Sequence, residues 1–251
     1  MLDVLIRRPD RRLADFVSHY WLSRDNALAC HPVLPDGCVD IVVEATGCAS
    51  RSWIFGTTTR RTDIPVIPGR HYLGIRFNPG KSRHFVDVPA RELTDARVSA
   101  QGLRCFPIDG IAEQVAAGDV FSEIDAVLTK WLARHPPESN PTDAAIGIIE
   151  TTRDSIRIGK VAATLGISRR HLARRFVEVV GVSPKLYAMV WRSRRTLRFL
   201  AKRPDVPLAD VALAMGYADQ SHMTRELRSL TGNTPREIPG RDVPFVQDFA
   251  L

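Results

Sequence analysis

The side chains with the clearest potential for specific chemistry are hydrogen-bonding residues that recur in two matched stretches of the chain. Arg174 in the first stretch corresponds to Arg225 in the second, 51 residues later. Arginine can donate to both acceptors of guanine, and glutamine can bridge adenine, where these bases face the major groove of DNA. The pattern therefore indicates side chains that recognise base edges. The residues expected to contact or anchor DNA in this way are Ser168, Arg169, Arg170, Arg174, Gln220, Ser221, Thr224 and Arg225.

Each stretch has the sequence pattern of a helix-turn-helix. Residues 158–166 and 208–216 are alanine-rich apolar runs that end in glycine, and a second helical pattern follows each of them. The offset between the copies is 50 residues before the turn and 51 after it, so the second turn holds one extra residue. A duplicated two-helix unit whose second helices carry arginine indicates one chain that binds DNA at two places.

Local signals position the arginines on the outer side of each second helix. Gly166 and Gly216 can adopt the positive φ that closes a helix. Ser168 and Asp219 stand where an N-cap is needed. Apolar residues then recur with helical spacing, which predicts one buried stripe per helix. These stripe residues are Leu172, Phe176 and Val179 or Val180 in the first copy, and Met223, Leu227 and Leu230 in the second.

Ordinary helical hairpins with solvated arginines are the alternative interpretation. For either copy alone, that alternative is as good as the DNA-binding one. The presence of both copies in one chain disfavours it.

A long basic helix is predicted between the two copies, from Pro184 to about Lys202. Proline is favoured at the first helical position, and 19 residues at 1.5 Å each span about 28 Å. Adjacent major grooves on one side of a duplex recur every ~34 Å, so this helix suits two recognition helices in successive grooves. Its basic residues are expected to contact phosphate or simply to solubilise the helix. They are Lys185, Arg192, Arg194 and Arg195.

The excess positive charge lies in the second half of the chain. Residues 141–251 hold 18 Lys and Arg against 11 Asp and Glu, whereas residues 1–140 hold 17 of each kind. A net charge of +7 confined to the proposed DNA-binding half is the electrostatic footprint that phosphate binding requires. Binding to a membrane surface is the competing use of a basic region, but no basic amphipathic helix with an aromatic face is evident.

The second half resembles the DNA-binding region of the AraC/XylS family of bacterial transcription regulators, over about residues 141–238. The residues that carry the resemblance in the first copy and connecting helix are Val161-Ala162, Gly166, Ser168, 171–176, 181–184, Tyr187, Arg192 and Leu200. Those in the second copy are Val211-Ala212, 215–217, 222–225, Gly232 and Thr234-Pro235. Two features depart from the family, at three positions. Met223 and Leu227 stand where members often carry aromatics, and Ala173 offers a base only a methyl contact.

The resemblance implies a transcription regulator, and more narrowly an activator, whose partner is double-stranded DNA. It also implies a homodimer, a small-molecule effector and RNA polymerase as candidate partners. No cofactor is expected. The start of the chain lacks a signal-peptide pattern and no segment approaches 18 apolar residues, so we expect no membrane partner and a cytoplasmic location.

The first half has a β-rich pattern. Apolar, β-branched or alternating runs at 16–22, 39–43, 53–55 and 72–77 predict strands, and the turn signals between them are Pro35-Asp-Gly37, Gly47, Gly56, Pro68-Gly69 and Pro79-Gly80. Short strands divided in this way suggest a small barrel or double sheet. The phrases at 34–41, 74–80 and 92–95 resemble an uncharacterised N-terminal domain of some AraC-type regulators, where better-known members carry a cupin-like sensor barrel.

Several residues of this half are candidates for lining an effector pocket, although a role in the core is the commoner one for such residues. They are His19, Trp21, Trp53, His71, Arg76 and His84. The four cysteines, Cys30, Cys38, Cys48 and Cys105, lack CxxC spacing. Three of them lie close enough in sequence to form a metal cluster with His31, but reduced core thiols are the default in a cytosolic protein, and we expect no metal site.

The predicted fold class is a multidomain α+β chain. A β-rich sensor or dimerisation domain occupies 1–107, and linker helices at 108–140, broken near Gly118-Asp119, either dimerise or pack on their own β domain. An all-α domain with two helix-turn-helix units joined by a long helix occupies 141–240. An apolar tail at 241–251 is expected to dock on the protein. The prolines of 135–141 favour an interdomain linker.

Two other functions fit parts of the pattern. One is a DNA-repair methyltransferase of the adaptive-response type, which combines such a module with a metal-held nucleophilic cysteine. Its cysteine spacing is not found, and neither is a Ser/His/Asp or glycine-rich phosphate motif, so no enzymatic activity is expected. The other is an architectural DNA-binding protein whose first domain only dimerises. A cavity lined by side chains in that domain would favour a sensor over an architectural protein.

Overall fold

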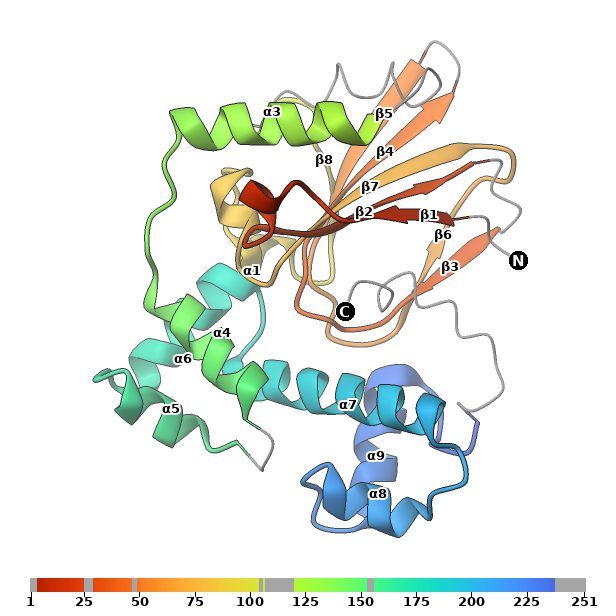
Figure 1. Cartoon of the computed structure of the whole chain (residues 1–251), viewed down its shortest axis with the longest axis vertical. Helices are drawn as coiled ribbons and strands as arrows, with labels where there is room; N and C mark the ends of the chain where they lie inside the picture. The colour runs from red at the N-terminus through yellow and green to blue at the C-terminus, as the bar shows by residue number, and fades with distance from the viewer. Residues whose placement is uncertain are drawn as a thin grey trace.

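The structure is a computed structural model that describes residues 4–24, 29–46, 49–103, 106, 120–152 and 156–237. A β-rich domain precedes a helical domain, as the sequence predicts (Figure 1). The strands are β1 (Val4–Arg7), β2 (Val17–Ser23), β3 (Cys30–Val33), β4 (Asp40–Thr46), β5 (Ala49–Phe55), β6 (Thr62–Pro65), β7 (His71–Phe77) and β8 (Arg97–Ser99). The helical elements of this half are η1 (Arg11–Leu13), η2 (Ser82–His84), α1 (Ala90–Leu93) and α3 (Val120–Arg134).

The strands form two antiparallel sheets. Six of them pair in the order β1-β2-β7-β4-β5-β8, and β3 pairs with β6 in a separate ribbon. The four strand segments predicted from the sequence are β2, β4, β5 and β7, which form the centre of the large sheet. β1, β3, β6 and β8 are not among the predicted strands. The glycines predicted to form turns at 37, 69 and 80 all have positive φ, whereas Gly47 lies outside the described residues.

Side chains alternate between the two faces of the large sheet, because successive residues of a strand point to opposite sides. One face carries large apolar residues such as Tyr20, Ile41 and Leu73, all fully buried. Helix α3 covers this face (Figure 1) and contributes Phe121, whose ring stacks on Tyr20 at 6.0 Å. The Tyr20 hydroxyl donates to Asp125 of α3 at 2.8 Å. The opposite face is directed toward the β3–β6 ribbon.

The linker helices were expected either to dimerise or to pack on their own β domain, and α3 packs on that domain. Its apolar residues Val120, Phe121, Ile124 and Leu128 belong to the core of the β domain. Residues 107–119, which include the predicted break near Gly118, lie outside the described residues. The segment after α3 forms no helix or strand until Pro141, as its prolines predict. The tail at 241–251 also lies outside the described residues.

The helical domain has two separate cores. Its elements are α4 (Pro141–Thr151), α5 (Ile158–Thr164), α6 (Arg169–Val180), α7 (Pro184–Lys202), α8 (Leu208–Ala214) and α9 (Gln220–Thr231). Helices α4, α5, α6 and the start of α7 enclose one core around Leu172 and Phe176. The end of α7 encloses the other with α8 and α9, around Met223 and Leu227. The predicted 19-residue helix thus runs through both halves, and no helix in the described part of the chain combines the length and apolarity needed to cross a membrane.

Candidate functional site

The first helix-turn-helix has the local geometry that its sequence predicts. Gly166 has a φ of +65° after α5, and Ser168 then caps α6 by accepting a hydrogen bond from the backbone N–H of His171 at 3.1 Å. Gly181 ends α6 in the left-handed region with a φ of +88°. Leu172 and Phe176 are fully buried, so the opposite side of α6 faces solvent. The polar side chains exposed there include Ser168, Arg169, Arg170 and Arg174.

The second helix-turn-helix repeats this geometry. Asp219 caps α9 through a hydrogen bond from the N–H of His222 at 2.6 Å, and Gly232 ends it with a φ of +77°. Both α6 and α9 have 12 residues, whereas the turns before them have four (165–168) and five (215–219). The extra residue predicted in the second turn is therefore confirmed. Among the predicted contact residues, Gln220, Ser221 and Arg225 are exposed and Thr224 is half-buried.

The basic residues of α7 do not share one environment. Lys185 is exposed, as expected for a phosphate contact. Arg192 instead points into the protein. Its guanidinium donates to both carboxylate oxygens of Glu226 in α9 and lies 4.3 Å from the centre of the Tyr217 ring. The side chain of Glu226 is only 4% exposed, so this is an interior ion pair.

Arg194 and Arg195 are also half-buried. Arg195 donates to the carbonyl of Thr152 at 3.1 Å, and Arg194 lies 6.0 Å from the centre of the Trp191 ring. Arg192 and Arg195 thus bond to α9 and to the end of α4. The sequence alone does not reveal these contacts, because both partners are distant along the chain. The expectation that Arg192, Arg194 and Arg195 contact phosphate or solubilise α7 stays a prediction.

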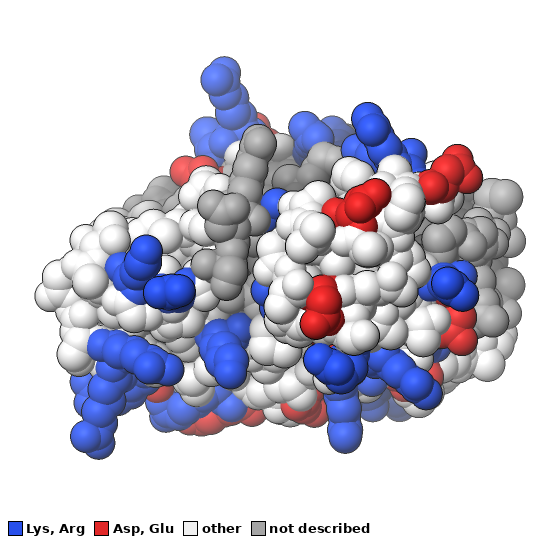
Figure 2. Space-filling model, turned by 90° about the horizontal axis from the view of Figure 1, so that it is seen from below, with Lys and Arg blue, Asp and Glu red and all other residues white. Residues whose placement is uncertain are grey.

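Positive charge lies in several groups on the surface. Figure 2 shows Lys and Arg side chains along the lower edge of this face and also at its upper edge, with uncharged surface and some Asp and Glu between the groups. Arg169, Arg170 and Arg174 are exposed in the N-terminal half of α6, and Arg225 is exposed in the N-terminal half of α9. Free N–H groups and positive charge at helix N-termini attract phosphate.

Helix α6 is anchored to the β domain by its last turn. Thr57 donates to the carbonyl of Val180 at 2.8 Å, and Thr94 donates to that of Gly181 at 2.7 Å. Arg91 pairs with Glu178 one turn earlier. Lys81 and Arg83 pair with Asp143 of α4. The β domain thus contacts the C-terminal end of α6 and leaves the arginines at its N-terminal end exposed.

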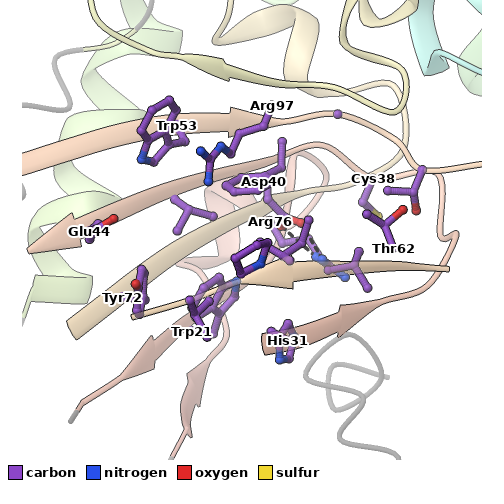
Figure 3. Close-up of a pocket in the computed structure, with 18 of the residues that line it drawn as sticks. Trp21, His31, Cys38, Asp40, Glu44, Trp53, Thr62, Tyr72, Arg76 and Arg97 are labelled. Atoms are coloured by element: carbon purple, nitrogen blue, oxygen red, sulfur yellow. Dashed lines mark hydrogen bonds and ion pairs between the residues drawn. The ribbon is translucent and has the colours of Figure 1, made fainter. Parts of the chain in front are cut away.

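A cavity of about 410 Å³ lies between the large sheet and the β3–β6 ribbon (Figure 3). Three of the six residues predicted to line a pocket, Trp21, Trp53 and Arg76, do line it. His19, His71 and His84 do not belong to its walls. His84 packs instead beside Phe16, with ring centres 5.4 Å apart.

Several wall residues were not predicted from the sequence, among them Ser23, Asp36, Asp40 and Tyr72. Strand periodicity is the signal that could have found one of them, because Tyr72 lies four residues from Arg76 on the same strand.

The cysteines show no arrangement for metal or nucleophilic chemistry in the described part of the chain. No group of three potential metal ligands occurs there, and Cys48 and Cys105 lie outside it. Cys30 is exposed and Cys38 is buried. Burial raises the pKa of the Cys38 thiol well above its ordinary value, which disfavours the nucleophilic thiolate.

Comparison with known proteins divides the chain in the same way. Residues 161–240 match a family described as a helix-turn-helix domain, and residues 6–99 match a domain of unknown function. The Msm operon regulatory protein of Streptococcus mutans serotype c is 23% identical over 138 residues, which are 53% of this chain and 49% of that protein. A protein described as an AraC-like transcription regulator of Streptomyces antibioticus is 30% identical over 87 residues, or 35% of this chain and 28% of that one. The chain thus spans half or less of the length of these relatives.

A solved structure is similar to part of the chain. It is a transcriptional regulator of Chromobacterium violaceum, titled as containing an AraC-type DNA-binding domain, with 26% identity and a TM-score of 0.36. The match covers 39% of this chain and 87% of that one.

Proposed function

We propose that this chain, whose C-terminal half is a helix-turn-helix domain of the AraC type, is a transcription regulator that recognises a specific DNA site with two helices in successive major grooves. The observation that carries this proposal is the matched pair α6 and α9. Both have 12 residues, a capped N-terminus and an exposed arginine at the same position, Arg174 and Arg225. A single helix of 19 residues connects the two units. Its length of about 28 Å is close to the ~34 Å groove repeat.

The exposed polar residues divide into two proposed roles. Arg174 and Arg225 recognise base edges, because arginine is suited to guanine. Gln220 and Thr224 precede Arg225 on the same helix, by five residues and one residue. The residues nearest the N-termini of the two helices position the protein on phosphate, which donors at helix N-termini do well. These residues are Ser168, Arg169, Arg170 and Ser221, together with Lys185 of α7.

The β domain is proposed to sense a small molecule. A lined cavity of about 410 Å³ is within the usual range for small organic ligands, and it favours a sensor over a purely architectural role. A homodimer remains part of the proposal on the strength of the family resemblance. Because α3 places its apolar side on its own domain, such a dimer would use another surface.

The experiment has two stages. The full chain selects its DNA site from a random pool, and that site is then titrated with Arg174→Ala, Arg225→Ala and a control. Arg134→Ala is a matched control, since Arg134 is exposed at the end of α3 and its loss changes the net charge equally. Loss of a bidentate base contact costs about 1–3 kcal/mol, which is roughly 5- to 150-fold in affinity.

We expect each recognition-helix variant to relax base preference at one of two sub-sites about 10 base pairs apart, and the control to bind like the original chain. If both variants bind the selected site with unchanged affinity and preference, α6 and α9 do not recognise bases. If no sequence is enriched at all, the chain is not a sequence-specific regulator.

A further inference from the structure

The wall of the cavity is built from one face of the large sheet. The pairing of β2, β7, β4 and β5 aligns Trp21, Gly74, Val42 and Trp53 in one row across four strands. A Cβ atom at Gly74 would lie 1.9 Å from Cε2 of Trp21, so the glycine is what allows the indole to lie on the sheet. The central row is therefore apolar and has an aromatic ring at each end (Figure 3). Such a wall favours a ligand with a flat, apolar body.

The rows on either side carry charges that are already matched within the protein. Arg76 donates to both oxygens of Asp40 and to Asp36. Glu44 accepts from Arg70 at 2.5 Å, and the side chain of Glu44 is 11% exposed. A charged ligand would have to break or rearrange one of these pairs, which is costly when a partner is buried.

The titratable and charged groups nearer the rim add no unmatched buried charge. Burial and the nearby charge of Arg76 lower the pKa of His31, which favours the neutral imidazole. Asp95 accepts from the N–H and hydroxyl of Thr59 at 2.7 and 2.6 Å. Arg97 is exposed, and its guanidinium lies 4.3 Å from the centre of the Trp53 ring. Arg51 is likewise exposed to solvent.

Two uncharged hydroxyl groups in the wall still lack a partner. Ser23 is 5% exposed, and neither its Oγ nor the Oγ1 of Thr58 has a hydrogen-bond partner among the described residues. Both residues line the cavity. Buried hydroxyl groups are normally hydrogen-bonded, and an unmade bond costs free energy. These two groups therefore suit a ligand that carries a neutral polar group.

The loop between β3 and β4 connects the cavity with both helix-turn-helix units. Asp36 and Cys38 line the cavity. Between them, Gly37 contacts the ring of Tyr187 in α7 so closely that a Cβ atom there would lie 2.4 Å from Cε2. At the start of the loop, Leu34 belongs to the core formed by α7, α8 and α9. This segment, residues 34–38, is called the coupling loop below.

A hydrogen-bonding junction extends the contact to the first unit. The hydroxyl of Thr57 lies 2.8 Å from the carbonyl of Val180 at the end of α6 and 3.3 Å from the carbonyl of Cys38. Displacement of the coupling loop would therefore change the contacts at the end of α6 and at α7. The coupling loop is therefore one direct connection between the cavity wall and the helical domain.

We infer that the cavity binds an uncharged, largely aromatic molecule carrying a hydroxyl, carbonyl or amide group, and that its occupancy changes DNA affinity through the coupling loop. The ligand stacks on Trp21 and bonds to Ser23. It changes the position of Asp36, and with it the loop's contacts with Tyr187 and the second helical core. The second half of this inference rests on the proposed DNA-binding function, and the first half does not.

The ligand class is tested by calorimetric titration of the full chain with three probes of one ring system. These probes are 2-naphthamide, 2-naphthoate and 2-naphthylmethylammonium, which are neutral, negative and positive. We expect the neutral probe to bind at least about ten-fold more tightly than either ion. Ser23→Ala should weaken it about ten-fold, whereas Ser99→Ala, at an exposed residue of β8 outside the wall, should not. Tighter binding of an ion, no binding of any probe, or an unaffected Ser23→Ala would overturn the ligand class.

The coupling is tested by titrating the selected DNA site with and without saturating 2-naphthamide. We expect the probe to change DNA affinity at least about five-fold. Gly37→Ala should abolish the change while probe binding persists, because a side chain cannot fit between the loop and Tyr187. Circular dichroism establishes that the variant is folded, and Gly69→Ala is its control, since Gly69 also has positive φ but has no neighbour within 4 Å of an added Cβ.

Each failure has a separate meaning. Specific DNA binding that ignores the bound probe would refute the coupling and leave the proposed function intact. A probe response that survives in a folded Gly37→Ala would refute the coupling loop as the route. Absence of specific DNA binding would refute the proposed function, and the calorimetric test of the ligand class would still stand.

Discussion

Replacing Arg192 with methionine tests whether the interior ion pair holds α9, the second of the two helices proposed to recognise DNA, in place. Arg192 donates from Nε to Glu226 at 3.0 Å, and from Nη1 to the carbonyl of Gly216 at 3.2 Å. Its Nη2 bonds to the second oxygen of Glu226. One side chain of α7 thus fixes both the turn before α9 and the middle of α9 itself.

The magnitude follows from what the substitution leaves behind. Methionine retains much of the apolar stem of Arg192, so little packing is lost. The carboxylate of Glu226, whose side chain is 4% exposed, would remain in the interior without its partner. Removing one member of a buried pair costs about 3–5 kcal/mol. We expect Arg192→Met to lower the free energy of unfolding by that amount and to weaken binding at the α9 sub-site more than at the α6 sub-site.

Urea denaturation of the full chain, followed by circular dichroism, measures the change in stability. The matched control is the double variant Arg192→Met with Glu226→Gln, which removes the stranded charge and should recover part of the loss. DNA footprinting then compares protection of the two sub-sites. A single variant within about 0.5 kcal/mol of the original chain, with equal protection of both sub-sites, would refute the proposed role of the pair.

Three further predictions concern stability and salt dependence. Gly181→Ala should lower the melting temperature more than Gly166→Ala, because both have positive φ but only at position 181 would a Cβ lie 2.9 Å from the carbonyl oxygen of Ala90; equal effects would contradict this. Burial lowers the pKa of His84 from 6.5 to about 4, so as pH falls through this range the unfolded chain gains the proton first and stability declines. His84→Gln should therefore make the melting temperature fall less as the pH is lowered. A variant whose melting temperature depends on pH as the original chain's does would rule out this role of His84. Lys185→Ala should reduce the slope of log affinity against log salt by about 1, and an unchanged slope would show that Lys185 does not contact phosphate.

The two helix-turn-helix units and α7 could be predicted from the sequence almost to the residue, because their signals are local, whereas α4 was not predicted. The Ser168 and Asp219 caps lie within three residues of the N–H groups they accept from, and Gly181 and Gly232 end their helices without help from distant segments. Pro184 begins α7 as expected. A cap, a stripe of period 3.6 and a terminal glycine act within one helix, so their meaning does not depend on tertiary structure.

The β domain could be predicted only in part, because strand pairing is long-range. The β3–β6 ribbon joins residues 30–33 to 62–65, and each of its strands contains a proline, which weakens a strand pattern. Strands β1 and β8 have four and three residues, too few for alternation to stand out. A sequence-based prediction that omits β3 and β6 therefore omits the strands that form one wall of the cavity.

The site residues also divide into those that local patterns predict and those whose roles depend on distant segments. Arg174 and Arg225 were predictable as outward-facing because the buried stripe of each helix defines its other side. The role of Arg192 was not, because its partner Glu226 lies 34 residues away. Ser23 escaped notice because β2 has buried residues on both faces, which hides the alternation that would assign it to the cavity.

The position of Leu34 has a consequence for how the chain can be divided and recombined. The linker after α3 marks a boundary along the sequence, but a side chain from the first domain completes a core of the second. A helical domain expressed alone would leave an apolar gap where Leu34 packs, and a chimera would need a first domain whose loop offers a side chain of the same shape. A genetic screen for lost DNA binding should therefore return substitutions at position 34, although Leu34 is not among the residues proposed to contact DNA. The two domains are separate along the sequence, but their side chains must fit one another for the second core to be complete.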